Sequence, residues 1–244
     1  ITTSTPHLSN MATAGITFHN CISQPLCTPS RVKIMTGQNN YKNYEYFGYL
    51  NSNQKTFGNL FQERGYTTCI AGKWQLNGLA YPDIIPDWHL PNRVNDFGFD
   101  HYCLWQLTQP RSEGERYADP LVEADGEILR PGKDAYGPDV FSNYILDFIS
   151  EHQDQPFFVY YPMVLVHDPF VPTPDSETWT DTTLRYQNDV CYFEEMVAYT
   201  DQIVGRIRTH IERLGLAEET LIIFTADNGS HPSIVSLTGN GVIK

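Results

Sequence analysis

The chain has 244 residues, of which 41% are hydrophobic and 13% aromatic, and its formal net charge is −13 at pH 7. This length can bury one large core, while no apolar run approaches the roughly 18 residues that a membrane-spanning helix requires. The acidic balance argues against nucleic-acid binding, because that function needs a basic face that displaces counterions. A local cluster of positive groups would have to attract any anionic substrate.

The cysteines indicate which kinds of stabilising site the chain lacks, and its two ends indicate whether the domain is complete. Five cysteines with no CxxC pair predict neither a zinc site nor a dense disulfide framework. No signal peptide is visible, and the opening ITTSTPHLSNMATAG reads like the middle of a fold. The closing TGNGVIK carries no stop signal either. We therefore expect residues of the domain to be missing at both ends.

Proline and glycine delimit the first predicted element, in the stretch CTPSRVKIMTG. Pro29 suits the first position of a helix and Gly37 suits its end, so the sequence predicts a short helix over 29–36. Cys27 would lie just before the amino end of this helix.

A second helix and a first strand are predicted next. Residues 56–65 form an amphipathic pattern closed by a glycine, and 66–72 form a strand pattern closed by another glycine. The stretch 80–135 is rich in Pro, Asp and Gly and lacks periodicity, which predicts a long excursion that shapes a substrate site or packs irregularly over the core. Trp88 and Trp105 within it could stack on sugar faces, although such aromatics are more often core.

Helical and strand patterns alternate in the second half of the chain. Helices are predicted over 138–152 and 189–214, each with an apolar stripe at helical spacing. The apolar run 156–167 predicts a strand buried on both faces. The stretch 220–229 predicts a second buried strand that runs into a polar loop. Alternating helices and strands with short links predict an α/β fold, a mostly parallel sheet with helices on both faces.

Polar residues follow three of the predicted strands. They are Lys73, His167 and the triplet Asp227-Asn228-Gly229. Ligands of parallel sheets bind at the carboxyl ends of the strands, so these residues are candidates for a site. Each also has a plain structural interpretation: a solvated loop lysine, a histidine that caps a strand end, and a common turn tripeptide.

Cys27 has a chemical context at the predicted helix start. Unpaired backbone N–H groups and the helix dipole there favour an anion or a nucleophile. Arg31, one turn further on, adds a cation that can hold an oxyanion through two donors. A buried structural thiol is the alternative for Cys27.

The segment Cys27–Arg31, CTPSR, resembles the first signature of the type I, formylglycine-dependent sulfatases of the alkaline phosphatase-like superfamily, C-x-P-x-R. The other matching motifs, in the family's order, are TG at 36–37, GYTTCIAGKW at 65–74, FGFD at 97–100, HDP at 167–169 and ADNG at 226–229. The resemblance covers essentially the whole chain. Residues 1–244 would then be an incomplete N-terminal catalytic α/β domain, lacking the first strand and the C-terminal part.

The resemblance implies a nucleophile and a cation. A maturation enzyme would oxidise Cys27 to formylglycine, whose hydrate attacks sulfur; its second hydroxyl later expels the sulfate. Asp227 and Asn228 would be oxygen ligands of one divalent cation, most often calcium, which also holds the modified Cys27 and a sulfate oxygen.

The resemblance also implies how the sulfate is bound. Arg31 would orient the hydrate, Lys73 would bind the sulfate oxygens, and His167 would contact the sulfate or the leaving group. Gln75 stands where the family usually has a histidine, and glutamine cannot carry a proton at neutral pH. His167 is therefore expected to protonate the leaving group, with Gln75 a hydrogen-bond donor to the sulfate.

Two parts of the family's site have no counterpart in the chain. A pair of aspartates usually lies on a first strand, which would precede Ile1, and a Gly-Lys-Gly segment would follow the last residue. Lys244 does not match that pattern and receives no role.

The predicted function is hydrolysis of sulfate esters on a sugar, a polysaccharide or an aryl group. Two alternatives stay open: a phosphonate or phosphodiester hydrolase on the same scaffold, and a catalytically silent relative that binds sulfated glycans. The family resemblance implies a periplasmic or secreted location, or a lysosomal one in a eukaryote.

Overall fold

The structure, a computed structural model, describes residues 3–238 and 241–243, and it divides into two compact units. The sheet unit consists of Ser23–Met163 and Ile223–Asn228, and the helical unit consists of the described residues within 1–22, 164–222 and 229–244. Each candidate residue of the predicted site except His167 belongs to the sheet unit. The prediction about Lys244 lies outside the described residues.

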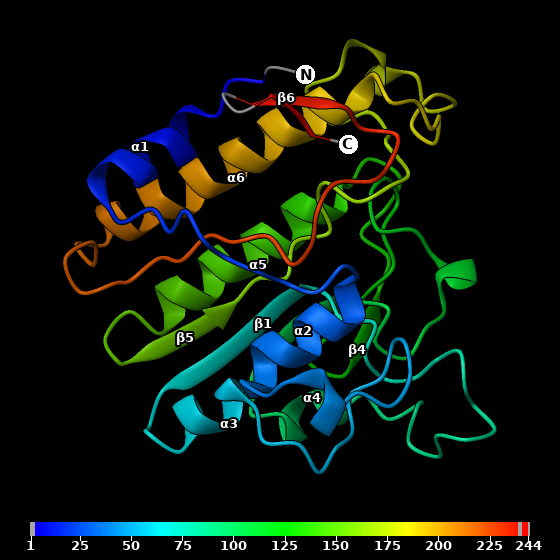
Figure 1. Ribbon diagram of the computed structural model, residues 1–244, viewed down its shortest axis with the longest axis vertical. Coiled ribbons are helices and arrows are strands. Elements are labelled where there is room, and N and C mark those ends of the chain that lie inside the picture. The colour runs from blue at the N-terminus through cyan, green and yellow to red at the C-terminus, as the bar shows by residue number, and fades with distance from the viewer. Residues whose placement is uncertain (1–2, 239–240, 244) are drawn as a thin grey trace. The chain divides into compact units, whose positions relative to one another are not determined.

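The sheet unit is built on five strands in the order β4-β3-β2-β1-β5 (Figure 1). They are β1 (Thr67–Lys73), β2 (His101–Trp105), β3 (Val122–Ala124), β4 (Glu127–Leu129) and β5 (Phe157–Tyr160). β1 pairs in parallel with both β2 and β5, whereas β3 pairs antiparallel with β2 and β4. The parallel centre of this sheet, with its helices, confirms the predicted α/β class.

Helices cover both faces of the sheet. They are α2 (Cys27–Thr36), α3 (Phe57–Gln62), α4 (Arg93–Asp96) and α5 (Gly137–Glu151), with single-turn helices η1 (Asn40–Lys42) and η2 (Arg111–Glu113) in the loops. Because side chains alternate along a strand, Ile70 and Tyr102 face one side, where they join the apolar core that includes Val32 of α2. On the other side Cys69 and Cys103 lie near Tyr144 of α5. Figure 1 shows α2 and α5 on opposite sides of β1.

The helical unit is organised by α1 (Pro6–Ala14) and α6 (Tyr192–Arg213), with η3 (Glu177–Thr180) and the hairpin β6 (Ser236–Thr238) and β7 (Gly241–Ile243). The Asp201 carboxylate of α6 accepts the backbone N–H groups of His7 and Leu8 at 3.0 and 2.8 Å, so it caps the start of α1. None of the helices in the described part of the chain is long and apolar enough to span a bilayer.

Four sequence predictions agree with the structure. The predicted helices 138–152 and 189–214 correspond to α5 and α6, and the predicted strand 66–72 corresponds to β1. The helix predicted over 56–65 is α3, which Thr56 starts with a capping box. Strong periodicity and clear end signals made these elements predictable.

Both later strand predictions need correction. The run 156–167 forms only the four-residue β5, which is half-buried because it pairs with β1 alone, and Pro162 has no N–H to continue the ladder. No strand forms over 220–229, where Leu221 and Ile223 are exposed. Apolar, β-branched residues form a strand only where a neighbour satisfies their backbone groups, and no described strand pairs with this segment.

Two smaller differences concern the first half of the chain. α2 begins at Cys27, two residues before the predicted 29–36, because Pro29 is tolerated anywhere in the first turn, where N–H groups have no intrahelical partner. The stretch 80–135, expected as an excursion, holds β2, β3 and β4, so it extends the sheet. Its short strands carry too few residues to show a period.

Candidate active site

Cys27 is the first residue of α2 and is half-buried. Leu26 before it is extended and offers no side-chain cap, so no side chain caps the N–H groups of the first turn. Gly37 ends the helix at φ 65°, and its N–H donates to Lys33 O at 2.9 Å. The predicted position of Cys27 at a helix N-terminus is confirmed, in a slightly longer helix.

Arg31 joins α2 to the carboxyl end of β1. Its Nη1 donates to Trp74 O at 2.6 Å and its Nη2 to Lys73 O at 2.7 Å, and the guanidinium also hydrogen bonds to Tyr160 of β5. Burial raises the pKa of Tyr160, and Arg31 opposes that rise. The Arg31 Nε is buried without a hydrogen-bond partner among the described residues. A fixed cation with an unused donor therefore lies one turn after Cys27.

Lys73 ends β1 and is only 5% exposed. Its pKa is lowered to about 8, chiefly by burial. The nearby charges act in both directions: Cys27 and Asp227 raise the pKa, whereas Arg31 and Arg116 lower it. These opposing influences show that the lysine lies within electrostatic reach of all four groups. Cys27, Arg31, Lys73 and Asp227, which are separated by up to 200 residues in sequence, therefore gather at one end of the parallel sheet.

Arg116 is a candidate residue that the sequence did not reveal. It is buried, and its guanidinium lies 4.7 Å from the centroid of the Trp105 ring and 5.4 Å from that of Tyr117. Trp105 is the residue opposite Lys73 in the β1–β2 ladder. Because Arg116 lies in a stretch without periodicity, only the sheet brings it near the lysine.

The donors available for a cation are Asp227 and Asn228. Both are half-buried at the end of the 223–228 segment, and the Asp227 charge acts on both Lys73 and Tyr160. A carboxylate and an amide suit a hard cation such as calcium, but supply only part of the six to eight oxygens it takes. Within the residues the structure describes, no three His, Cys, Asp or Glu side chains converge on one point.

His167 belongs to the helical unit, seven residues beyond the end of β5. Its Nδ1 lies 2.8 Å from Asp168 O and 3.0 Å from the Asp168 carboxylate, and the side chain is partly exposed. Its predicted role at the sulfate stays a prediction.

Gln75 lines a pocket of about 210 Å³ in the sheet unit. The other lining residues are Phe47, Gly48, Leu79, Ala80, Gln106 and Pro110. Gly48 connects this pocket to α2, because its N–H donates to the hydroxyl of Thr28, the residue after Cys27, at 3.1 Å. Gln75 and Gln106 both have positive φ, 48° and 55°.

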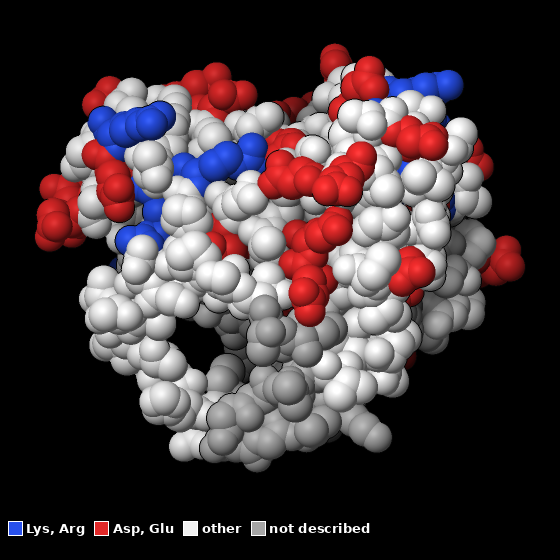
Figure 2. All heavy atoms as spheres, turned by 90° about the horizontal axis from the view of Figure 1, so that it is seen from above, with Lys and Arg blue, Asp and Glu red and all other residues white. Residues whose placement is uncertain are grey.

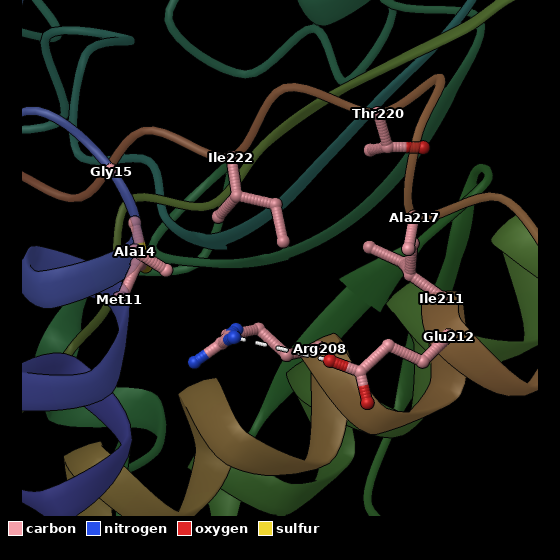
Figure 3. A pocket seen from close by; sticks show the side chains of 9 residues that line it. All are labelled: Met11, Ala14, Gly15, Arg208, Ile211, Glu212, Ala217, Thr220 and Ile222. Atoms are coloured by element: carbon pink, nitrogen blue, oxygen red, sulfur yellow. Dashed lines mark ion pairs between the residues drawn. The ribbon is translucent and has the colours of Figure 1, made fainter.

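The helical unit has a separate hollow of about 200 Å³ between α1 and α6. Figure 3 shows Ile222 pointing into it and the pair Arg208–Glu212 along α6. The two side chains are 3.9 Å apart, and Arg208 Nη1 also donates to His7 O at 3.2 Å. Arg208, the cation that lines this hollow, therefore already has partners within the helical unit.

The parallel sheet and its strand-end cluster define the class of protein: an α/β fold with buried cations gathered around a cysteine at a helix N-terminus. The chain belongs to the sulfatase family, because the family model described as "Sulfatase" matches residues 1–240.

The curated relatives are sulfatases. Mouse N-acetylgalactosamine-6-sulfatase is 27% identical over 97% of this chain and 47% of its own length. Human arylsulfatase A is 28% identical over 98% of this chain and 50% of its own length. The chain therefore spans about half the length of these relatives.

Solved structures share the fold. A sulfatase from a Pseudoalteromonas species superposes with a TM-score of 0.68 at 21% identity, covering 94% of this chain and 50% of the other. The phosphonate monoester hydrolase of Agrobacterium radiobacter gives a TM-score of 0.62 at 16% identity, covering 92% of this chain and 57% of the other. At these identities the likeness concerns the fold.

Proposed function

We propose that the full-length protein hydrolyses sulfate esters of sugars, using a nucleophile made from Cys27. The observation that carries the proposal is the convergence of Cys27, Arg31, Lys73 and Asp227 at the carboxyl end of β1. The relatives' names point the same way, and one structural neighbour with a TM-score of 0.64 contains D-glucosamine-2-N,6-O-disulfate as its substrate.

Cys27 would be the precursor of the nucleophile. A maturation enzyme would oxidise its thiol to the aldehyde of formylglycine, whose hydrate supplies one hydroxyl to attack sulfur and a second to expel the sulfate. The first turn of α2 then offers unpaired N–H groups to the hydrate oxygens, and Arg31 offers its buried Nε. Arg31 is held by the backbone carbonyls of Lys73, the last residue of β1, and of Trp74, so it needs little reorganisation.

Lys73 would hold the sulfate oxygens, because its ammonium is buried beside Cys27. Asp227 and Asn228 would supply oxygen ligands to a calcium ion, whose charge would assist binding of the anionic ester and of the modified Cys27. His167 would give the proton that the departing sugar alkoxide needs, since Gln75 is not an acid.

The direct test is sulfate release by the full-length protein expressed with a maturation enzyme. We expect turnover of 4-nitrophenyl sulfate and of at least one sugar sulfate, and loss of turnover in Lys73→Ala. Lys55→Ala is the matched control, because Lys55 is exposed and pairs with Glu63.

The same assay separates the alternatives. Turnover of a phenyl phosphonate with none of either sulfate ester would support the phosphonate hydrolase. Binding of sulfated glycans without turnover of any ester would support the silent relative. The expected periplasmic, secreted or lysosomal location is part of the proposal, and fractionation of the source cells tests it.

A further inference from the structure

The pocket beside Gln75 has a feature that the sulfate does not explain. Gln106 directly follows β2, and its side-chain Oε1 is buried without a hydrogen-bond partner among the described residues. A buried acceptor without a donor is costly, so native structures seldom leave one unmatched. Sulfate carries only acceptor oxygens and cannot supply the missing donor.

Gln75 and Gln106 are joined by a backbone hydrogen bond and share an unusual backbone conformation. Gln75 N–H donates to Gln106 O at 3.1 Å, which joins the two residues just past the ends of β1 and β2. Their φ values of 48° and 55° are uncommon for residues other than glycine. Such conformations cost free energy and are concentrated at binding sites, where the surrounding structure holds them. Both amides therefore line one pocket from adjacent strand ends.

The residues that line the pocket indicate which kind of ligand would fit it. None of the seven residues is charged, and Phe47, Leu79 and Pro110 provide apolar surface. The volume of about 210 Å³ equals roughly seven water molecules at about 30 Å³ each, which is room for one ring. Two primary amides both donate and accept, as hydroxyl groups do.

We propose that this pocket is the subsite for the sugar ring that carries the sulfate, with Gln106 hydrogen bonded to a hydroxyl group of that ring and Phe47 packed against its C–H face. Gln75, beside Gln106, would keep its expected role as a donor to the sulfate. The pocket thereby selects a neutral, hydroxyl-bearing ring over an aryl ring. The inference rests on the proposed function, because it assigns the alcohol part of the same ester. Gly48 of the pocket is hydrogen bonded to Thr28, the residue after Cys27.

The test compares two esters in the full-length, matured protein. The probes are hexose sulfates (galactose 6-sulfate, glucose 6-sulfate and their N-acetyl forms) and 4-nitrophenyl sulfate, which has no hydroxyl groups on its ring. We expect Gln106→Leu to lower kcat/KM for the best hexose sulfate about 10- to 100-fold, and to lower that for the aryl ester at least tenfold less. Gln106→Asn, which tolerates a positive φ, should show the same selectivity if Leu impairs folding.

The matched control is the same Gln→Leu substitution at a glutamine that lies away from the pocket. Gln155 is exposed and donates to Thr67 Oγ1 at 3.1 Å, at the opposite end of β1 from Gln75. Gln155→Leu should leave the ratio of the two kcat/KM values as in the parent. Equal losses on both esters in the Gln106 variants, or no loss on the hexose sulfate, would overturn the subsite while leaving the sulfatase function intact.

A binding measurement distinguishes failure of the function from failure of the subsite. If the parent turns over neither ester, the proposed function is wrong. Calorimetric titration of the hexose sulfate into Cys27→Ala, with and without Gln106→Leu, then decides the inference. Weaker binding by the double variant supports the pocket, and equal binding overturns it.

Discussion

Lys73 is a buried cation of the candidate site whose pKa is lowered to about 8, chiefly by burial. A lysine with a pKa of about 8 is charged below that pH and loses its charge above it. Between pH about 8 and the ordinary pKa of lysine, Lys73 therefore binds more protons in the unfolded state than in the folded state. The contribution of Lys73 to the free energy of unfolding consequently rises as the pH increases from about 8.

We predict that kcat/KM for a sulfate ester falls above pH about 8, as the Lys73 ammonium that binds the anion is lost. The Lys73→Arg variant should retain a flat alkaline profile at a lower absolute rate, because arginine stays charged. A pH series of kcat/KM for both proteins is the measurement. An identical alkaline fall in the arginine variant would assign that fall to another group.

Cys27→Ser should abolish repeated turnover and leave the fold unchanged. Serine retains a hydroxyl at the start of α2 but lacks the second oxygen that expels sulfate, so at most one turnover is expected. Pre-steady-state sulfate release, with circular dichroism as the check on folding, measures this. Mass spectrometry of the parent peptide should show the aldehyde, and an active preparation with an unmodified thiol would rule the mechanism out.

The effect of His167→Ala on kcat/KM should depend on the leaving group of the ester. A sugar alkoxide needs a proton, and general acid assistance is worth about 10²–10⁴-fold, whereas a nitrophenolate leaves without it. We therefore expect the variant to lose far more kcat/KM on a sugar sulfate than on 4-nitrophenyl sulfate. His152→Ala is the control, since that histidine packs on Phe148 of α5. Equal losses on the two esters would remove the acid role.

At the scale of elements, the junction of β1 and β5 positions the lysine. Lys73 N–H donates to Pro162 O at 2.8 Å, which fixes the end of β1 against the residues that follow β5. This close approach requires Gly72, at φ 119°, because a Cβ there would lie 2.3 Å from Pro162 O. The glycine that closes the strand pattern in the sequence thus has a packing reason.

Gly72→Ala should destabilise the protein more than Gly126→Ala. Both glycines have positive φ, which costs an alanine roughly 1–3 kcal/mol, but a Cβ on Gly126 would meet no atom within 4 Å. We expect an additional loss of about 2 kcal/mol or more at Gly72 from the overlap with Pro162. Urea denaturation of the full-length variants measures the difference. Equal losses of unfolding free energy would show that the backbone at Pro162 can move to accommodate the Cβ.

At the scale of the whole molecule, the site is a positive cluster in an acidic protein. The net charge is −13, and in the face shown in Figure 2 Asp and Glu cover more of the upper part than Lys and Arg do. This charge repels an anionic ester, so we expect binding to depend on the buried cations of the cluster. A cation held by Asp227 and Asn228 would assist binding in the same way.

Removal of the cation should abolish activity. We predict that chelation of the full-length, matured protein eliminates turnover and that calcium restores it, since the available ligands are hard oxygens. Zinc should restore less. Activity is assayed against metal content determined by elemental analysis. Undiminished turnover in a metal-free preparation would show that the cation has no catalytic role.

The amino-acid sequence by itself determined the α/β class, the helices α5 and α6, the strand β1 and the start of α2 near Cys27. These features depend on local periodicity, on proline and glycine, and on motifs with fixed spacing, which are readable one segment at a time. The ends of predicted elements and the family resemblance also named Cys27, Arg31, Lys73 and Asp227 as members of one site. They did not reveal Arg116 or Gln106.

Only the tertiary structure decided the features that depend on neighbours distant in sequence. Whether 220–229 forms a strand depends on a pairing partner, and β5 is half-buried because it has one neighbouring strand. Arg116 comes near Lys73, and Gln106 comes beside Gln75, only because β2 pairs with β1. Burial, hydrogen-bond satisfaction and charge interactions are properties of these long-range contacts, so local sequence patterns do not specify them.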